Sequence, residues 1–216
     1  MLSKRLLQLA DFIPKNEIVA DVGSDHGLLL CYLAEKQSLN KGYAIDIAEG
    51  PLTRAQENIT RGAYTNITTI LSNGLNDLPA DTSVVVIAGL GYLTIKGILQ
   101  DNWDKLWGLE AIIVQCNSQI KLFRKFLGER RVNILDECWV KDYKDYQLIK
   151  FNLKEQKDYS EAESYFGPYL LQRKPPEFLD YYHRYYKKIK RNFFLNQKNE
   201  LKNEINLIRE FLQDFF

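Results

Sequence analysis

The amino-acid sequence predicts an α/β domain followed by a helical region. Short β-branched runs alternate with helical segments through the first 150 residues, and the runs at 84–87 and 111–114 are apolar throughout. Continuously apolar strands are typical of parallel sheets that helices cover on both faces. Beyond residue 151 the pattern is helical only. We therefore expect an α/β domain over residues 1–152 and a helical domain over residues 153–216.

The first domain is expected to contain strands at 17–21, 42–46, 65–71, 83–88, 111–115, 132–139 and 146–151. Helical segments are expected at 28–36, 51–61, 92–100, 103–107 and 120–127. Because helices separate most of the first five strands, these strands should pair in parallel. Only residues 140–145 separate the last two strands, which is too short for a crossover. We therefore expect an antiparallel hairpin at one edge of the sheet.

The second domain begins with a charged, weakly helical stretch at 154–163, which Gly167-Pro168 and Pro175-Pro176 punctuate. Apolar residues then recur at spacings of four and three, which is typical of amphipathic helices. They are Phe178, Tyr182, Tyr185, Ile189 and Phe193, and then Leu201, Ile205, Ile208, Leu212 and Phe215. Two helices joined near Asn196 would bury these seams on each other as an antiparallel hairpin of coiled-coil type.

The composition excludes several classes of protein. With 45% hydrophobic residues and only three cysteines, the chain is neither a disordered protein nor a disulfide-rich miniprotein. Its 29 basic and 28 acidic residues leave a net charge of +1, so any preference for nucleic acid or membrane must be local. The longest apolar run, 84–90, is too short to span a membrane, and the cysteines and two histidines lack zinc-binding spacing. We expect a reduced, metal-free, cytoplasmic protein without a membrane partner.

A strand that runs into a glycine turn is the first candidate binding site. Residues 18–27 read I-V-A-D-V-G-S-D-H-G. Glycines let the backbone approach a ligand, and the helix that follows offers free amide donors. The dinucleotide pattern G-x-G-x-x-G, counted from Gly23, meets Asp25 and Leu28 where it needs glycine. The sequence therefore argues against a nicotinamide or flavin cofactor.

Acidic residues and glycines also end the next strands. Asp46 ends the second strand, where a carboxylate can accept both ribose hydroxyls of an adenosine cofactor. An acid at the end of the first strand, in place of a pyrophosphate cradle, suits a cofactor that has a cationic amino-acid tail and no phosphate, as S-adenosylmethionine does. Strand ends share one edge of an open α/β sheet, where ligands bind. The candidate cofactor-binding residues are Asp21, Gly23, Ser24, Asp46, Ile47, Asn73, Gly74, Ala88 and Gly89.

Four motifs make the resemblance to a known family specific. They are D-V-G-S-D-H at 21–26, D-I-A-E-G-P-L at 46–52, N-G-L at 73–75 and I-A-G-L-G at 87–91. With Gln115, Asn117, Arg124, Glu137 and Gly167-Pro168 in the same order, the chain resembles the tRNA (adenine-22-N1)-methyltransferase family, TrmK. The resemblance implies a Rossmann-like class I S-adenosylmethionine-dependent methyltransferase domain, followed by a coiled-coil-like helical domain.

The chain departs from the family pattern at the expected wall of the target-base pocket. Leu90 and Tyr92 replace the methionine and the last glycine of A-G-M-G-G. Cys116 stands where the family tends to have the proline of L-Q-P-N, and is expected to be structural. Residues 27–30, G-L-L-L, also differ from the family's A-Y-L-P.

The resemblance implies methyl transfer from S-adenosylmethionine to N1 of adenine 22 in tRNA. Adenine N1 carries a free lone pair at neutral pH, so alignment and electrostatic support suffice without an obligatory general base. Asp25 either accepts a hydrogen bond from the exocyclic amine of a flipped base or serves as the N-cap of the next helix. For His26, the alternatives are a packing role, orientation of the base or proton transfer. Tyr92 could close part of the base pocket or supply a ring on which the base stacks. Gly91, Gln115 and Asn117 are candidates to bind the base, although the last two could instead cap a strand end.

A basic, aromatic stretch at 181–191 is the candidate tRNA contact of the helical domain. Basic side chains between aromatic ones suit phosphate contacts and stacking on unpaired bases. The alternative is a solvated basic face on a helix whose other face is core, and both can hold because helical spacing places the basic residues off the seam. The basic residues are Arg184, Lys187, Lys188 and Arg191, and Lys15, Arg124, Lys125, Arg130 and Arg131 could extend the surface on the first domain.

Two rival functions stay open from the sequence. A methyltransferase with another substrate would act without RNA. A tRNA-binding protein that retains the fold but has lost turnover would fit the departures at Leu90, Tyr92 and Cys116. We expect the chain to be a monomer.

Overall fold

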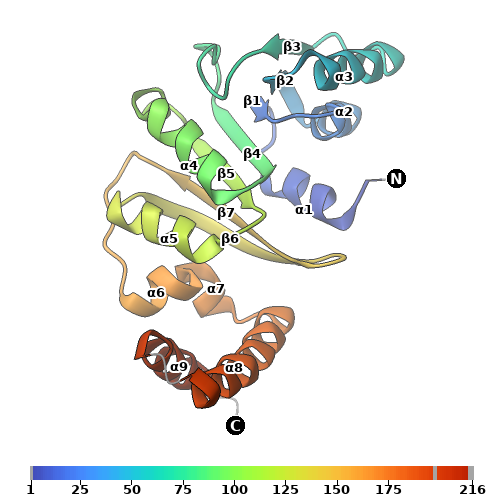
Figure 1. Ribbon diagram of the computed structural model, residues 1–216. Helices are drawn as coiled ribbons and strands as arrows, with labels where there is room; N and C mark the ends of the chain where they lie inside the picture. Colours follow the sequence, from blue (N-terminus) through green and yellow to red (C-terminus); the bar gives the residue numbers. More distant parts are fainter. Residues whose placement is uncertain (1, 197–198, 214–216) are drawn as a thin grey trace.

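The computed structural model describes residues 2–196 and 199–213 and consists of a three-layer α/β sandwich with a helical region packed against one end (Figure 1). The strands are β1 (Glu17–Val22), β2 (Leu39–Asp46), β3 (Ile67–Leu71), β4 (Val84–Leu90), β5 (Ala111–Cys116), β6 (Asn133–Lys141) and β7 (Asp145–Asn152). The helices are α1 (Lys4–Phe12), α2 (Leu28–Glu35), α3 (Glu49–Arg61), α4 (Tyr92–Asp101), the 3-10 turn η1 (Trp103–Leu106), α5 (Ile120–Glu129), α6 (Glu161–Phe166), α7 (Pro168–Arg173), α8 (Pro176–Asn196) and α9 (Asn199–Leu212).

The strands form one seven-stranded sheet in the order β3-β2-β1-β4-β5-β7-β6. The pairs β2–β3, β1–β2, β1–β4 and β4–β5 are parallel. Strand β7 inserts antiparallel between β5 and β6. The prediction of a parallel sheet with an antiparallel edge hairpin is therefore confirmed. The strand order reverses between β1 and β4, which creates the switch point where open α/β sheets bind ligands.

Alternate residues of the central strands feed two separate hydrophobic cores. Val19, Val84 and Val86 pack under α1, α2 and α3, whereas Val85 and Ile87 pack under α4 and α5. Figure 1 shows these two groups of helices on opposite faces of the sheet. Burial on both faces explains why the central strands are apolar throughout.

Helix α1 was not expected from the sequence. Its first turn is capped by the Ser3 hydroxyl, which accepts a hydrogen bond from the Leu6 amide at 3.3 Å. Leu9 and Phe12 are buried in the core beneath the sheet. The sequence does carry a signal for this helix, because Ser3 precedes apolar residues with helical spacing.

Residues 153–160 form no helix, so the weak helix expected at 154–163 begins only at Glu161. A capping box between Ser160 and Glu163 sets that start. Helix α7, also not expected, begins at Pro168 after Gly167, whose φ of +95° favours glycine.

The helices α6 to α9 enclose a third hydrophobic cluster of their own. Phe166, Phe178, Tyr182 and Ile208 are fully or almost fully buried there. Trp139 of β6 enters the cluster and packs edge-on against Phe178 at a centroid distance of 5.3 Å. Of the seams expected along α8 and α9, five residues are buried and four are half-buried, while Phe215 lies outside the described residues. The buried residues are Phe178, Tyr182, Ile189, Ile208 and Leu212, and the half-buried ones are Tyr185, Phe193, Leu201 and Ile205. The coiled-coil geometry of this pair stays a prediction.

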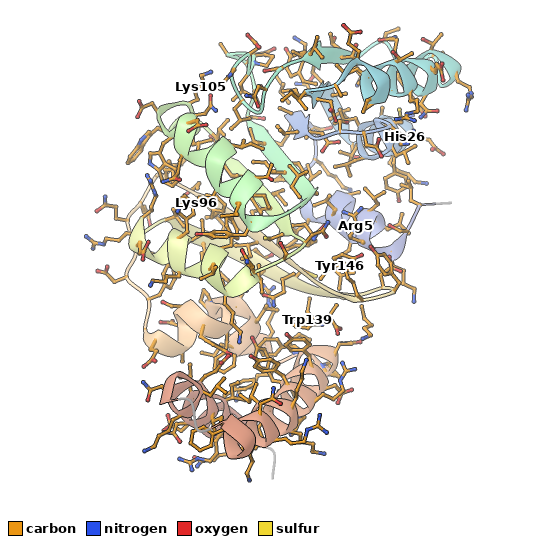
Figure 2. All side chains as sticks on the ribbon, viewed as in Figure 1. Arg5, His26, Lys96, Lys105, Trp139 and Tyr146 are labelled. Carbon is orange, nitrogen blue, oxygen red and sulfur yellow. The ribbon has the colours of Figure 1, made fainter. Side chains whose placement is uncertain are left out.

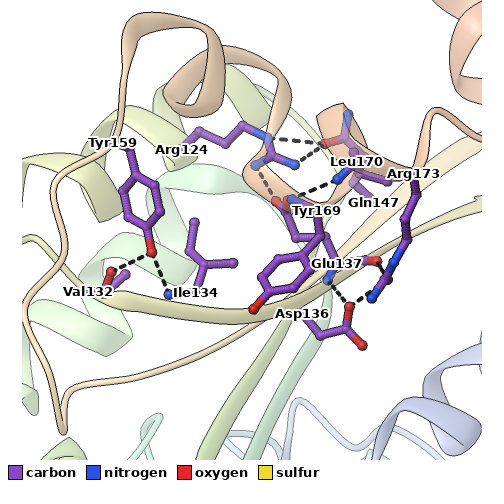
Figure 3. Close-up of polar contacts among 10 residues, drawn as sticks. All are labelled: Arg124, Val132, Ile134, Asp136, Glu137, Gln147, Tyr159, Tyr169, Leu170 and Arg173. Carbon is purple, nitrogen blue, oxygen red and sulfur yellow. Dashed lines mark hydrogen bonds and ion pairs between the residues drawn. The ribbon is translucent and has the colours of Figure 1, made fainter.

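A buried ion pair joins the helical region to the sheet (Figure 3). Arg124 of α5 pairs with Glu137 of β6, and these side chains are 2% and 0% exposed. The guanidinium also donates to Gln147 Oε1 at 2.8 Å. Glu137 Oε2 accepts hydrogen bonds from the amides of Tyr169 at 2.9 Å and Leu170 at 3.4 Å, in the first turn of α7. One carboxylate thus binds a cation and caps a helix.

Gly167 completes this junction, which we call the Glu137 clamp. A Cβ atom at position 167 would overlap the Glu137 carboxylate and the Arg124 guanidinium. Three of the features that carried the family resemblance, Arg124, Glu137 and Gly167-Pro168, therefore share one structural task at the junction rather than a place at the cofactor edge.

Candidate active site

The polar residues expected to bind the cofactor lie along one edge of the sheet. Residues 21 and 22 of β1 are in register with 44 and 45 of β2, and β4 is in register with β5 up to the pair Leu90 and Cys116. The turns after β1 to β5 therefore meet at the C-terminal edge. The turns after β1 and β4 flank the switch point.

The turn after β1 holds a buried carboxylate. Gly23 adopts φ +73°, and its amide and that of Ser24 donate to the Ile45 carbonyl at 2.9 and 3.1 Å. This turn places the Ser24 hydroxyl 2.8 Å from Asp21 Oδ2, to which it donates. Asp21 is 6% exposed, and this burial raises the pKa of its carboxyl to about 6. The Ser24 hydrogen bond and the nearby Arg5 cation partly offset that rise.

Asp25 does not cap the following helix. The N-cap of α2 is Gly27, and no side chain makes a capping hydrogen bond there. The N-cap interpretation of Asp25 was therefore wrong, because Asp25 lies two residues before the N-cap and adopts the left-handed conformation with φ +50°. Its carboxylate is 64% exposed and lies 3.4 Å from His26 Nε2. The structure thus supplies the acidic partner of His26 that the sequence did not identify.

Asp46 is placed to accept ligand hydroxyls at the end of β2. Its Oδ1 accepts from the Ala48 amide at 3.0 Å, and its Oδ2 accepts a long bond from the Asp25 amide at 3.4 Å. These bonds fix the carboxylate between the first two turns. Ile47, beside it, is 68% exposed and offers an apolar surface.

The turn after β3 is held by hydrogen bonds from Lys105, which lies in the 3-10 turn η1. Lys105 donates to the carbonyls of Leu75 at 2.8 Å and Asn76 at 2.6 Å. Gly74 packs against Ile98 of α4, while Asn73 is exposed. Asn73 is therefore presented to solvent on a fixed turn at the same edge as Asp46.

A hydrogen-bond network links β4, β5 and α1. Gln115, fully buried, accepts from Arg5 Nη1 at 2.9 Å and from the Gly89 amide at 3.1 Å. Its amide nitrogen donates to Asn117 Oδ1 at 3.1 Å, and Asn117 Nδ2 donates to the Gly89 carbonyl. The structure therefore brings Gln115 and Asn117 together with Gly89. Their amide groups hold the end of β4 in place.

A cavity of about 100 Å³ opens between this network and the first turn. Arg5 lines it from α1, opposite Asp21, and Ala88 lines it from β4. Figure 2 shows Arg5 beside Tyr146, whose ring centroid is 5.6 Å from the guanidinium carbon. Sequence reasoning missed Arg5, because its partners lie more than a hundred positions away. The remaining lining residues are Leu6, Leu9, Gly23, Ser24, Asp25, His26, Leu28 and Leu29.

The residues that depart from the family pattern are largely packed. Tyr92 is 9% exposed and belongs to the core beneath α4, so only a small part of its side chain is accessible. Leu90 packs close to Gly23. Burial raises the pKa of the Cys116 thiol, which donates to the Ser118 carbonyl. Gly91 is half-buried at the N-cap of α4.

The basic residues of α8 are all exposed, whereas Tyr182 and Ile189 are buried on the opposite face. The four predicted tRNA contacts, Arg184, Lys187, Lys188 and Arg191, are exposed, and so is Lys190. Arg184 also lies 3.6 Å from the Asp145 carboxylate at the start of β7. The expectation that helical spacing separates the basic face from the seam is therefore confirmed.

No helix within residues 2–196 and 199–213 is long and apolar enough to cross a membrane. In the same residues, no group of three or more histidine, cysteine, aspartate or glutamate side chains is arranged to hold a metal ion.

Comparison with known proteins identifies the family. Residues 2–149 match the methyltransferase domain family. The tRNA (adenine(22)-N(1))-methyltransferase of Bacillus subtilis (strain 168) is 32% identical over 151 residues, which are 68% of this chain. The chain spans 63% of the length of that curated relative.

Solved structures agree over almost the whole chain. M. capricolum TrmK in complex with S-adenosyl-homocysteine has a TM-score of 0.84 at 31% identity, covering 99% of this chain and 98% of that one. The Streptococcus pneumoniae protein Sp1610 in complex with S-adenosyl-L-methionine gives 0.89 at 30%, covering 98% and 100%. The B. subtilis m1A22 tRNA methyltransferase TrmK gives 0.87 at 25%, covering 98% and 99%. The predicted Rossmann-like methyltransferase fold is thus confirmed, and the chain belongs to the methyltransferase domain family and, within it, to the TrmK family of tRNA (adenine(22)-N(1))-methyltransferases.

Proposed function

We propose that this chain transfers a methyl group from S-adenosylmethionine to N1 of adenine 22 in tRNA. The observation that carries the proposal is the pair of carboxylates, Asp21 and Asp46, at the ends of two adjacent parallel strands beside the switch point. Family membership selects the substrate, because the curated relative is a tRNA (adenine(22)-N(1))-methyltransferase.

The edge of the sheet suits S-adenosylmethionine chemically. Asp21 is a buried carboxylate whose side-chain hydrogen bond comes from the neutral Ser24 hydroxyl, so a ligand ammonium group would supply a compensating charge. Asp46 keeps lone pairs to accept two ribose hydroxyls. Ile47 and Gly74 would border the adenosine, and Ala88 and Gly89 would border the reacting end. When bound, the cofactor supplies a methyl group on a positively charged sulfur.

The protein's own contribution to the reaction is alignment and charge. Adenine N1 is a neutral nucleophile, so positive charge spreads into the base and its exocyclic amine as the bond forms. Asp25, exposed beside the cavity and paired with His26, would accept a hydrogen bond from that amine. His26 would orient Asp25 rather than remove a proton. Gly91 and the exposed Asn117 would form the wall of the base pocket. Gln115, which is fully buried, would hold Asn117 in place, and Tyr92 would support that wall from the core.

We further propose that the helical region holds the folded tRNA through the exposed basic face of α8. The boundary expected at residue 152 is better drawn near Ser160. Leu153 is buried in the first core, and the Tyr159 hydroxyl accepts from the Ile134 amide at 2.8 Å. As a tRNA-modifying enzyme, the chain would act in the cytoplasm, and we expect a monomer.

The test is methyl transfer from labelled S-adenosylmethionine to an unmodified tRNA transcript that carries adenine 22, beside the same transcript with guanine at that position. We expect 1-methyladenosine, identified by nucleoside mass spectrometry, only in the first transcript. Transfer to both transcripts, or to a substrate without RNA, would contradict the proposed site. Binding of both cofactor and tRNA without transfer would instead support a degenerate enzyme, with Leu90 and Tyr92 as the first residues to revert.

A further inference from the structure

The turn between β6 and β7 lies between the cavity and the basic helix. On one side, Asp142 Oδ2 accepts a hydrogen bond from the Arg5 amide at 3.1 Å. On the other side, the Asp145 carboxylate lies 3.6 Å from Arg184 of α8 and 3.1 Å from Lys141. Figure 1 shows the end of the β6–β7 hairpin reaching out between α1 and α8. The turn is therefore held at a fixed place between two surfaces assigned to the same substrate.

An exposed aromatic ring stands at this turn. Tyr143 is 81% exposed, which makes it the most exposed large apolar side chain among those that the structure describes. Its ring packs edge-on against Tyr146 at a centroid distance of 5.5 Å. Tyr146 is 2% exposed and in turn contacts the Arg5 guanidinium. A short series of contacts thus leads from the exposed ring to the wall of the cavity.

The charge of the turn favours an anionic partner. Asp145 pairs with Lys141 and Arg184, whereas Asp142 accepts from the uncharged Arg5 amide and keeps its negative charge. Three basic residues, Lys141, Lys144 and Arg184, therefore outnumber these two acidic ones, which leaves a net charge of +1. Lys144 forms no ion pair with the residues the structure describes, and its ammonium lies 5.8 Å and 5.0 Å from the ring centroids of Tyr143 and Tyr146. A single exposed aromatic is common on protein surfaces. An exposed ring beside a lysine that forms no ion pair with the described residues, fixed between the candidate active site and a basic helix, matches the chemistry that binds unpaired nucleotides.

We propose that Tyr143 stacks on an unpaired base of the RNA substrate, next to the nucleotide that reaches Asp25, and that Lys144 contacts a neighbouring phosphate. The inference rests on the proposed function, which supplies RNA as the substrate. It adds a contact at the catalytic domain, distinct from the basic face of α8. Stacking of a base on an aromatic ring is worth enough to change affinity about tenfold.

The test compares Tyr143→Ala, Tyr143→Phe and Lys144→Ala with the wild type. Trp107→Ala serves as a matched control, because Trp107 is also an exposed aromatic, 52% exposed, but lies before β5 at the opposite edge of the sheet. We expect Tyr143→Ala to raise the Kd and KM for the tRNA transcript about tenfold. Tyr143→Phe and Trp107→Ala should stay within about twofold of the wild type. Lys144→Ala should weaken binding and lower its salt dependence by about one phosphate contact.

Three results would overturn the inference. They are an unchanged tRNA affinity for Tyr143→Ala, an equal loss of affinity for S-adenosyl-homocysteine, and loss of a wild-type dimer in sedimentation when the ring is removed. Failure of the proposed function is seen separately, because it appears in the wild-type protein as tRNA binding without 1-methyladenosine at position 22. In that case the comparison of tRNA Kd values still decides the role of Tyr143.

Discussion

Replacing Arg124 with methionine leaves the Glu137 carboxylate buried without its cation. The two side chains are 2% and 0% exposed, so water cannot replace the lost partner. Methionine fills much of the space of the arginine stem, which limits the effect of a cavity. The perturbation therefore isolates the charge of the Glu137 clamp from its packing.

Removing one partner of a buried ion pair costs about 3–5 kcal/mol. The lower end applies here, because the Tyr169 and Leu170 amides still donate to the carboxylate. A loss of about 3 kcal/mol is a large share of the 5–15 kcal/mol that stabilises a typical protein. For a chain of this size it lowers the Tm by roughly 6–12 °C.

Urea unfolding followed by tryptophan fluorescence measures the loss, since Trp139 packs on Phe178 at the same junction. Arg173→Met is the control. Arg173 donates to Asp136 at 2.6 Å but is 51% exposed, so its loss should cost no more than about 1 kcal/mol. A cost for Arg124→Met as small as the control would refute the reasoning.

Three further predictions concern the ligands. Asp21, with its carboxyl pKa raised to about 6, must ionise to pair with a ligand ammonium. The affinity for S-adenosyl-homocysteine should therefore fall as the pH drops below about 6, and calorimetry of Asp21→Asn should show a weak, pH-independent affinity. Asp46→Ala should weaken cofactor binding about 10- to 100-fold through lost charged hydrogen bonds, with tRNA Kd unchanged, and an equal loss of both would contradict the assignment. Replacing Arg184, Lys187, Lys188 and Arg191 of α8 with alanine should weaken tRNA binding in filter assays and reduce the dependence of that affinity on salt concentration. Unchanged affinity would show that α8 is not part of the tRNA interface.

The sheet could be predicted from the sequence because burial on both faces imposes an apolar pattern that is visible locally. The run at 84–87 has this character because α1 to α3 and α4 to α5 cover opposite faces of the strand. Helix α7 could not be predicted in the same way. It has six residues, too few for propensity to decide, and Glu137, thirty-two positions before Tyr169, caps its first turn.

The same distinction holds for the candidate site. The acids and glycines at the strand ends could be found because each lies within a few residues of its strand. Arg5 and Asp142 could not, because each acquires its place through a partner 110 or 137 positions away. Asp25 shows the opposite error, in which a local preference for helix capping suggested a role that the left-handed backbone at Asp25 prevents.

The contacts between the helical region and the sheet indicate which part of the sheet the helical region can influence, the proposed tRNA site or the proposed cofactor site. The Glu137 clamp ties α7 to β6 and α5, and Arg184 of α8 reaches the start of β7. Lys121 of α5 pairs with Glu204 of α9, which also accepts from the hydroxyls of Tyr165 and Tyr185. All these contacts lie on the half of the sheet that holds β5, β7 and β6. The proposed cofactor carboxylates, Asp21 and Asp46, lie on the other half, at β1 and β2. Because β5 carries Gln115 and pairs directly with β7, the helical region is connected directly to the strand behind the proposed base pocket. It is connected only indirectly to the turns after β1 and β2, where the cofactor is proposed to bind. Changes in the helical region should therefore act on the tRNA substrate before they act on the cofactor.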